Sequence, residues 1–520
     1  MGGTLSPTAR VMTRLDSSYH YQPLAMAATD VEHNDIVQEQ DLEARRKLER
    51  KLVLKLDLML LPFLSFMYLF SSLDRSSLGN AVLDNFEEDV GITPDQFNTC
   101  ITIFYAGFLT FQIPSNILLK RFSARRWLPF LMVAWGTMAC LHATTKSYTQ
   151  LLLLRFFLGV FEAGFFPGVI FFLTLFYKKN EMATRIALFW GSTVAAHAYA
   201  GVLAYGILRL RGHYGMTGWQ WLFLIEGIPT VVVAIIAWFY LPASPDTWSR
   251  LTPEERALAI ARLQEDGTIS HHVTLADINA SNRKQVYKAL TDWKVWVWML
   301  MFFSGSVANT SISNFLPLIV KGMGFDDKLS ANLMSAPPYL CAVVVMIVLA
   351  HSSDKRNERT FHAIASASIC IVGYVLLMIL TSREALYAAV CIAVSGIFVV
   401  NPVVNAWLMS NIAPEMKRSI AAAMAVSANN ASGLLGSNIY RRSDAPRYLF
   451  GHMIALIFLI IFILLALFQR FALLRANRIK ANLIKEAEAE DDGLEEAAQV
   501  VQDADEGRVG DEALEFQYRV

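Results

Sequence analysis

The sequence predicts an all-α polytopic membrane protein with twelve transmembrane helices, arranged as two halves of six helices each. Its 520 residues are 54% hydrophobic and only 17% charged, whereas a soluble chain carries about 25% charged residues. The apolar residues gather in continuous segments, each long enough to cross a hydrocarbon core about 30 Å thick as a helix. A polar stretch separates six such segments from six more. These three observations define the fold class.

The elements follow one another in a simple order. Residues 1–51 form a polar tail that we expect in the cytosol, because no apolar run typical of a signal peptide precedes Leu52. An N-terminal six-helix bundle, 52–242, has apolar segments near 54–83, 97–119, 127–145, 150–176, 186–210 and 219–241. A cytosolic linker, 243–291, carries SRLTPEERALAIARLQEDG, which is typical of a short amphipathic helix. A C-terminal six-helix bundle, 292–475, has segments near 293–320, 329–350, 361–381, 385–411, 419–440 and 447–473, and an acidic cytosolic tail, 476–520, follows.

Composition excludes several classes of function. The 45 Lys and Arg residues balance the 45 Asp and Glu residues, so no excess of positive charge indicates a nucleic-acid partner. The five cysteines lie within apolar segments and lack the CxxC spacing of a metal site, which favours packing over disulfides or metal binding. The sequence has no phosphate-binding glycine loop and no nucleophile–base arrangement. An enzyme is the least favoured class, and we expect no cofactor.

Loop charge predicts how the chain is oriented in the membrane. Basic clusters near 45–55, 120–126, 178–185, 355–359 and 417–418 alternate with loops that are poorer in Lys and Arg. The first of these poorer loops, DNFEEDVGITPDQ, has five acids and no basic residue. The positive-inside rule then puts both termini and the linker in the cytosol. The lipid bilayer is one expected partner, and the plasma membrane is the expected location.

Two adjacent charges, Asp74 and Arg75, interrupt the first apolar segment. A charge in mid-membrane costs about 2.5–3.5 kcal/mol on insertion scales, so each must face a cavity or a partner. Successive residues of a helix diverge by about 100°, so the two cannot simply pair with each other. The Arg75 guanidinium stays charged and matches a carboxylate through two hydrogen bonds, which makes it the first candidate for a substrate anchor. The alternative is a structural ion pair with an acid on another helix.

A second pair of charges lies in the fourth apolar segment. Arg155 and Glu162 are seven residues apart, which puts both on one face of a helix, about 10 Å apart along its axis. Burial of Glu162 among Phe and Gly residues disfavours its ionised form, so this carboxyl is suited to load and release a proton. The alternative is a permanent clamp between Glu162 and Arg155 or Arg75.

Motifs in both halves make the chain resemble a known family. Two loops at corresponding places, LLKRFSARRW and HSSDKRNER, each put a basic cluster just past a helix end. Five further motifs occur in order: LDRSSLGNA (73–81), RFFLGVFEAGFFPG (155–168), GWQWLFLIEGIP (218–229), KRSIAAAMAVSANNASGLLGSNIYRRSDAPRY (417–448) and the final GDEALEFQYRV. With these, the sequence is similar to the major facilitator superfamily. Within it, the sequence resembles the anion:cation symporters, in the fungal allantoate, nicotinate and pantothenate permease branch.

The resemblance implies roles for the four charges inside the segments. It implies the major facilitator fold, a monomer, and a substrate site near the bilayer midplane between the two halves. Arg75 takes the position of the arginine that binds the substrate anion in related symporters. Asp74 and Glu162 take the positions of the acids that serve proton coupling, and we group Arg155 with them.

Five further polar residues inside the segments are candidates for the substrate site. The resemblance puts Tyr105 and Asn430 at positions that face the central cavity. His197 stands where a small or apolar residue is usual; it could titrate near neutral pH or donate to a substrate, and a backbone carbonyl could equally satisfy it. Asn314 and Asn405 could line the cavity from the second half, or could form hydrogen bonds between helices.

The two loops with basic clusters are candidates for a conformational switch between the halves. The residues concerned are Lys120, Arg121 and Arg125 in the first loop and Asp354, Lys355 and Arg359 in the second. The second loop keeps the Asp-basic-x-x-x-Arg pattern of the superfamily. The first departs from it, with Lys120 where an Asp is usual and Ser123 where a Gly is usual. Positive-inside anchoring also explains basic residues at these places.

These features together predict a secondary active transporter. We expect it to carry a small organic anion with a proton by alternating access, with the proton gradient as the driving force. A nicotinate-like monocarboxylate is the favoured substrate, because the run NTCITIFYAGF resembles the nicotinate permeases. The alternatives are a proton-driven exporter of drugs or secondary metabolites and, from another class, a nutrient sensor that does not transport.

Overall fold

The structure is a computed structural model that describes residues 22–178, 181–265, 285–324, 328–356, 358–413, 415–489, Asp511 and 516–519. The beginning of the predicted N-terminal tail, residues 266–284 of the linker and most of the acidic tail lie outside the described residues. The chain divides into two compact units, 1–58 and 59–520. All candidate site residues belong to the second unit.

All regular structure in the described residues is helical. The first half consists of α1 (Gln22–Ala81), the short α2 (Phe86–Val90), α3 (Pro94–Phe122), α4 (Ala124–Leu141), α5 (Tyr148–Glu162), α6 (Phe165–Thr174), α7 (Met182–Ile207) and α8 (Gly218–Tyr240). The predicted amphipathic helix of the linker is α9 (Pro253–Glu265). The second half consists of α11 (Trp293–Gly322), α12 (Lys328–Leu333), α13 (Ala336–Arg356), α14 (Thr360–Ile379), α15 (Arg383–Asn411), α16 (Glu415–Gly436) and α17 (Leu449–Ala489).

Membrane-spanning helices account for both halves. Ten helices in the described part of the chain are long and apolar enough to cross a membrane. The other two predicted segments, 186–210 and 419–440, correspond to α7 and α16, which have 26 and 22 residues. Both are long enough to span the membrane, but they contain more small and polar residues, as helices do where they pack on other helices. The predicted all-α fold of two six-helix halves is confirmed.

Two of the predicted segments are interrupted. The fourth is divided into α5 and α6, and α5 ends at Glu162. The eighth is divided into α12 and α13. The first of these breaks puts a candidate coupling residue at the end of a helix, which hydropathy alone could not predict.

Acids of the first loop secure one end of the first half. Arg211 Nη1 donates to Asp84 Oδ1 at 2.9 Å, and Arg211 Nη2 donates to Asp89 Oδ2 at 3.4 Å. The backbone N–H of Trp219, in the first turn of α8, donates to Asp84 Oδ2 at 2.9 Å, and its indole N–H donates to Asp89 Oδ2 at 2.8 Å. A carboxylate at a helix N-terminus satisfies unpaired N–H groups and suits the helix dipole.

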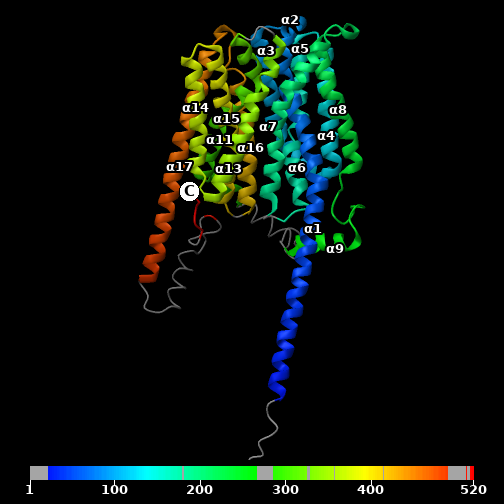
Figure 1. Cartoon of the computed structure of the whole chain (residues 1–520), viewed down its shortest axis with the longest axis vertical. Coiled ribbons are helices and arrows are strands. Elements are labelled where there is room, and N and C mark those ends of the chain that lie inside the picture. Colours follow the sequence, from blue (N-terminus) through cyan, green and yellow to red (C-terminus); the bar gives the residue numbers. More distant parts are fainter. Residues whose placement is uncertain are drawn as a thin grey trace, which may run out of the picture. The chain divides into compact units, whose positions relative to one another are not determined.

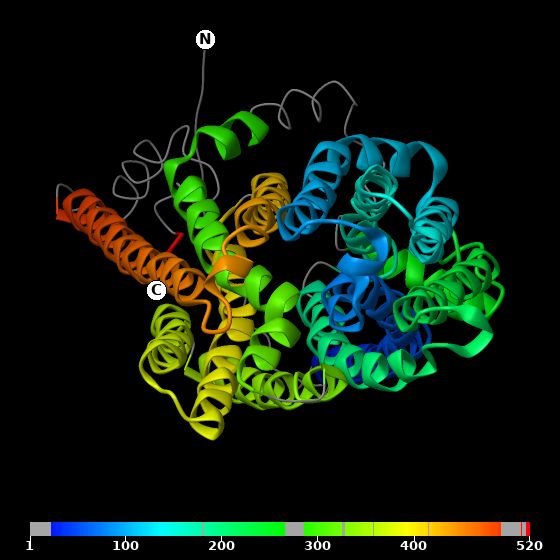
Figure 2. The same ribbon diagram turned by 90° about the horizontal axis from the view of Figure 1, so that it is seen from above.

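The helices of the second unit form two groups (Figures 1 and 2). Within the first half α3 packs on α5 and α4 on α8, and within the second half α14 packs on α15 and α11 on α16. The halves meet where α7 contacts α12 and α13, and where α3 contacts α16. On the outer face of α13, large apolar side chains are exposed, as expected for a surface that contacts lipid: Leu340, Val344, Ile347 and Val348.

Glycines permit close contacts between the halves. A Cβ added at Gly79 of α1 would lie 2.4 Å from the Asn314 backbone oxygen of α11. A Cβ added at Gly201 of α7 would lie 2.4 Å from the Asn332 backbone oxygen of α12. Real Cβ atoms do not approach backbone this closely, so any side chain at either position would push the halves apart.

We therefore predict that Gly201→Ala lowers the melting temperature of the purified protein by about 1–3 °C, because overpacking costs about 1–3 kcal/mol. Gly206→Ala, five residues further along α7, is the matched control, because a Cβ there meets nothing within 4 Å. Both changes replace a glycine of α7 by alanine, the residue with the higher helix propensity. Thermal unfolding in detergent measures the difference, and equal melting temperatures for the two variants would contradict this account of the interface.

Candidate functional site

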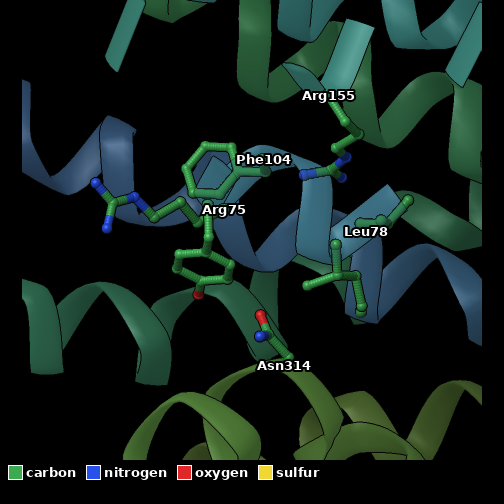
Figure 3. A pocket seen from close by; sticks show the side chains of 8 residues that line it. Arg75, Leu78, Phe104, Arg155 and Asn314 are labelled. Carbon is green, nitrogen blue, oxygen red and sulfur yellow. The ribbon is translucent and has the colours of Figure 1, made fainter. Parts of the chain in front are cut away.

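A small cavity lies where α1, α3 and α5 of the first half face α11 of the second (Figure 3). Its empty volume, counting space open to solvent, is about 310 Å³. The residues that line it are Arg75, Leu78, Gly79, Ile101, Phe104, Tyr105, Arg155 and Asn314. Four of the candidates predicted from the sequence therefore share one cavity: Arg75, Tyr105, Arg155 and Asn314.

Arg75 and Glu162 form an ion pair beside this cavity. Arg75 Nε donates to Glu162 Oε1 at 2.6 Å. The same oxygen accepts a hydrogen bond from Ser71 Oγ, one turn before Arg75 on α1. Glu162 Oε2 is buried and has no hydrogen-bond partner among the described residues. The Glu162 side chain is 1% exposed, whereas the Arg75 side chain is 27% exposed, so the cation is the partner that an incoming molecule can reach.

Two aromatic rings hold the Arg75 guanidinium in place. Its Cζ lies 5.5 Å from the ring centroid of Phe104 and 5.1 Å from that of Phe108, both on α3. Each distance is within the range of a cation–π contact. Of the two rings, Phe104 also lines the cavity, so the site combines a cation with a flat apolar surface.

Arg155 adds a second cation to the cavity. It lies on α5 with Glu162, and both side chains are buried on the same face of that helix, as the seven-residue spacing predicts. Arg155 is 3% exposed, and its Nε and Nη2 have no hydrogen-bond partner in the part of the chain that the structure describes. Because guanidinium N–H groups are rarely buried without acceptors, Arg155 is suited to receive an anion.

Asp74 faces away from Arg75, as the helical angle between neighbours predicts. Its Oδ2 accepts a hydrogen bond from Thr230 Oγ1 of α8 at 3.3 Å, and its Oδ1 is buried without a partner among the described residues. The acids that act on it electrostatically are Glu226 and Glu162. Asp74 therefore belongs to a cluster of carboxyl groups between α1, α5 and α8 and does not line the cavity.

Glu226 is a member of this cluster that sequence reasoning missed. It lies on α8, is 1% exposed, and accepts a hydrogen bond from Ser77 Oγ of α1. Its Oε1 is buried and has no hydrogen-bond partner among the described residues. The signal was available, because Glu226 is the one acid between Trp219 and Tyr240.

Of the other polar candidates, some line the cavity and others lie where helices pack against one another. Tyr105 and Asn314 line the cavity. The His197 ring lies against Tyr339 and Phe398 of the second half, at centroid distances of 5.3 and 5.8 Å. His197 Nδ1 donates to the Thr193 carbonyl oxygen at 2.7 Å. A backbone carbonyl therefore satisfies this side chain, which was the alternative to a role in substrate binding.

Two asparagine candidates of the second half are not in the cavity lining. Asn430 Nδ2 donates to the Val426 carbonyl oxygen of its own helix, α16, at 2.8 Å. Asn405 is half-buried on α15. A neighbouring network joins three helices instead: Asn429 Oδ1 accepts from Asn401 Nδ2 at 3.1 Å and from Ser306 Oγ.

The loops proposed as a conformational switch lie at helix ends, far in sequence from the cavity residues. Arg121 and Arg125 are exposed on either side of the turn between α3 and α4. Arg359 precedes α14, and its Nη1 donates to Ser353 Oγ at 3.1 Å. Lys355 is exposed in the last turn of α13. The side chains of Lys120 and Asp354 lie outside the described part of the structure.

Comparison with known proteins gives the family. A family model described as the Major Facilitator Superfamily matches residues 64–437. The chain therefore belongs to the major facilitator superfamily, and it is a multi-pass membrane transporter and not an enzyme.

Two relatives are similar over most of the chain. The MFS-type transporter efuF of Hormonema carpetanum is 35% identical over 398 residues, which cover 76% of this chain and 79% of the relative. The major facilitator-type transporter hxnP of Emericella nidulans is 35% identical over 408 residues, which cover 77% and 81%.

Solved structures share the fold at low sequence identity. A D-xylose-proton symporter superposes with a TM-score of 0.62 at 16% identity, covering 79% of this chain and 97% of that one. A bacterial homologue of the human lysosomal transporter Spinster, in an inward-facing and unoccupied conformation, superposes with a TM-score of 0.63 at 15% identity, covering 79% and 96%. These likenesses support the fold alone.

Proposed function

We propose that this transporter is a symporter that carries a small organic anion together with a proton, and that it belongs to the anion:cation symporters. The observation that carries the proposal is the cavity with two arginines, Arg75 and Arg155, of which Arg75 is paired with a buried carboxyl group, Glu162. Charged groups at such depth are costly unless they have a function or a partner. A monocarboxylate such as nicotinate suits the guanidinium groups that line this cavity.

The ion pair supplies a mechanism for coupling. An incoming carboxylate competes with Glu162 for the Arg75 guanidinium. If the substrate takes Arg75, Glu162 keeps only the hydrogen bond from Ser71. A buried charge left without its partner costs about 3–5 kcal/mol, and a proton on Glu162 removes that cost. The anion and the proton are therefore favoured to bind together.

Co-loading also gives a reason for the conformational change. Ligands shift a conformational equilibrium only as far as they bind one state better than the other. The cavity is lined by α1, α3 and α5 on one side and by Asn314 of α11 on the other. A substrate held by Arg75 thus sits where movement of one half against the other changes its contacts, as alternating access requires.

Uptake by reconstituted protein tests the proposal. Proteoliposomes with an alkaline interior should accumulate radiolabelled nicotinate, or another member of a panel of small carboxylates. Nicotinamide is the matched control, because it has the same ring and no charge, and it should not be accumulated. One proton per monocarboxylate is electroneutral, so the driving force to vary is the pH gradient. Transport of nicotinamide equal to that of nicotinate would exclude an anion site. Transport of the carboxylate only in the direction opposite to proton flow would favour the exporter.

A further inference from the structure

A separate set of contacts holds part of the C-terminal tail against the second half. The described tail residues, Asp511 and Phe516–Arg519, are called the tail peptide here. They contact the beginnings of α11 and α16, the end of α15 and the distal part of α17. In Figure 1 the tail peptide, in red, lies beside α17 at one end of the second half. None of these contacts involves the arginine cavity.

The Asp511 carboxylate lies between two lysines. Lys294 Nζ donates to Asp511 Oδ2 at 2.8 Å, and Lys417 Nζ donates to Asp511 Oδ1 at 2.8 Å. Lys417 also donates to Asp292 Oδ2 at 2.6 Å. The side chains of Asp511 and Lys417 are 1% and 2% exposed. Removing one member of a buried ion pair is strongly destabilising, since it leaves an unpaired charge.

Two asparagines of the bundle recognise the backbone of successive tail residues. Asn477 of α17 accepts from the Tyr518 N–H at 2.9 Å and donates to the Tyr518 carbonyl oxygen at 2.8 Å. Asn411 of α15 does the same for Arg519, at 2.7 and 2.9 Å. The Trp407 indole N–H donates to the Arg519 carbonyl oxygen at 2.9 Å. An amide side chain that satisfies both backbone groups of one residue replaces the pairing of a β-strand.

The Tyr518 side chain completes the contact. It is 5% exposed, and its hydroxyl donates to the Asp511 carbonyl oxygen at 2.6 Å. The ammonium groups of Lys294 and Lys480 lie 4.7 and 4.5 Å from the ring centroid, within range of cation–π contacts. An aspartate and a tyrosine seven residues apart are thus bound by different parts of one surface.

We propose that this end of the second half is a binding site for a short acidic and aromatic peptide, and that the chain's own tail peptide occupies it. The site takes one carboxylate between Lys294 and Lys417, one aromatic ring against lysine ammonium groups, and the backbone of two residues through Asn477 and Asn411. A bound tail joins the ends of α11, α15, α16 and α17, so it makes the second half move as one body. The proposal does not depend on what is transported.

The charge of Asp511 sets the pH range of docking. The titratable groups that face it are Asp292 and Lys294 of the α11 end, Lys417 of α16, Lys480 of α17 and Tyr518 of the tail itself. Burial by itself would raise the pKa of Asp511, but Lys294 and then Lys417 lower it below its ordinary value. Because the pKa of Asp511 is lower in the docked state than in a free aspartate, the charged form favours docking. This contribution is fully present above the pKa of a free aspartate, about 3.9, and is lost as the pH falls through the lowered pKa of the docked state. Docking is therefore constant through neutral pH.

Hydrogen exchange of the full-length protein tests the proposal. We expect the amides of Tyr518 and Arg519 to exchange at least tenfold more slowly than unprotected amides at pH 7. Asp511→Asn and, separately, Asn477→Ala should each reduce this protection at least fivefold while peptides from α13 and α14 stay protected, which shows that the second half is folded. Gln517→Ala is the control, because Gln517 is exposed between two docked residues, and it should keep the protection. Exchange of the wild-type tail at the unprotected rate, or equal protection in all three variants, would overturn the proposal.

Discussion

Arg75→Ala is expected to reduce carboxylate uptake at least 100-fold in proteoliposomes under an inward proton gradient. The guanidinium is the exposed member of its ion pair and lies in the cavity. Loss of a charge-assisted bidentate contact of about 3 kcal/mol corresponds to a factor of about 100. Arg75→Lys should also lose most of the uptake, because an ammonium keeps the charge but cannot form two parallel hydrogen bonds.

Two further variants distinguish a loss of transport from a loss of folding. Arg75→Ala leaves Glu162 buried without its cation, so the single variant can fold poorly for that reason alone. The double variant Arg75→Ala/Glu162→Gln removes the unpaired charge; it should recover the melting temperature and still fail to transport. Arg209→Ala is the control at a different arginine, because Arg209 contacts Tyr205 of α7 and does not line the cavity. Uptake by well-folded Arg75→Ala protein at the wild-type rate would remove Arg75 from the substrate site.

Glu162→Gln is expected to keep the exchange of carboxylate across the membrane and to lose its accumulation driven by the proton gradient. The amide keeps an acceptor for the Ser71 hydroxyl, cannot take up a proton, and no longer pairs with Arg75 as a charge. The variant should therefore exchange internal for external carboxylate at a rate within about threefold of wild type. Its accumulation under an imposed pH gradient should fall to the level seen without a gradient, because the proton no longer binds with the anion.

Glu226→Gln is the matched control for this result. Glu226 is also a buried carboxyl group, but it accepts from Ser77 and has no arginine among its described partners. We expect this variant to keep accumulation driven by the gradient. Loss of accumulation in Glu226→Gln, with accumulation intact in Glu162→Gln, would assign the proton to the cluster around Asp74 and Glu226 and contradict the role given to Glu162.

Local patterns were sufficient for the fold and for part of the site. Continuous apolar segments predicted the helices, and the seven-residue spacing of Arg155 and Glu162 predicted their shared face. Their long-range partners were not predictable, because periodicity is local. Arg75 and Glu162 lie 87 positions apart in the sequence. The sequence alone therefore could not decide whether Arg75 is a substrate anchor or a member of a structural ion pair.

Other features depend on packing that no single segment encodes. The break after Glu162 lies in a segment that is mostly apolar apart from Arg155 and Glu162, so hydropathy predicted one uninterrupted helix. His197, Asn405 and Asn430 are polar residues in plausible segments, yet none lines the cavity. A polar side chain in a membrane helix can be satisfied by its own backbone, as His197 and Asn430 are, and the sequence alone does not distinguish this from a binding role. The contact of the tail peptide joins Asp511 to Lys294 across 217 positions.

The central claim is that an anion binds the Arg75 end of the Arg75–Glu162 pair and a proton binds the Glu162 end, so that each ligand favours the binding of the other. The most direct measurement is the affinity of the purified protein for a transported carboxylate as a function of pH, in wild type and in Glu162→Gln. A proton on Glu162 frees Arg75, so the wild-type affinity should rise as pH falls, whereas the affinity of Glu162→Gln should be high and independent of pH over the same range. A wild-type affinity that does not change with pH, or a dependence that persists unchanged in Glu162→Gln, would contradict the account.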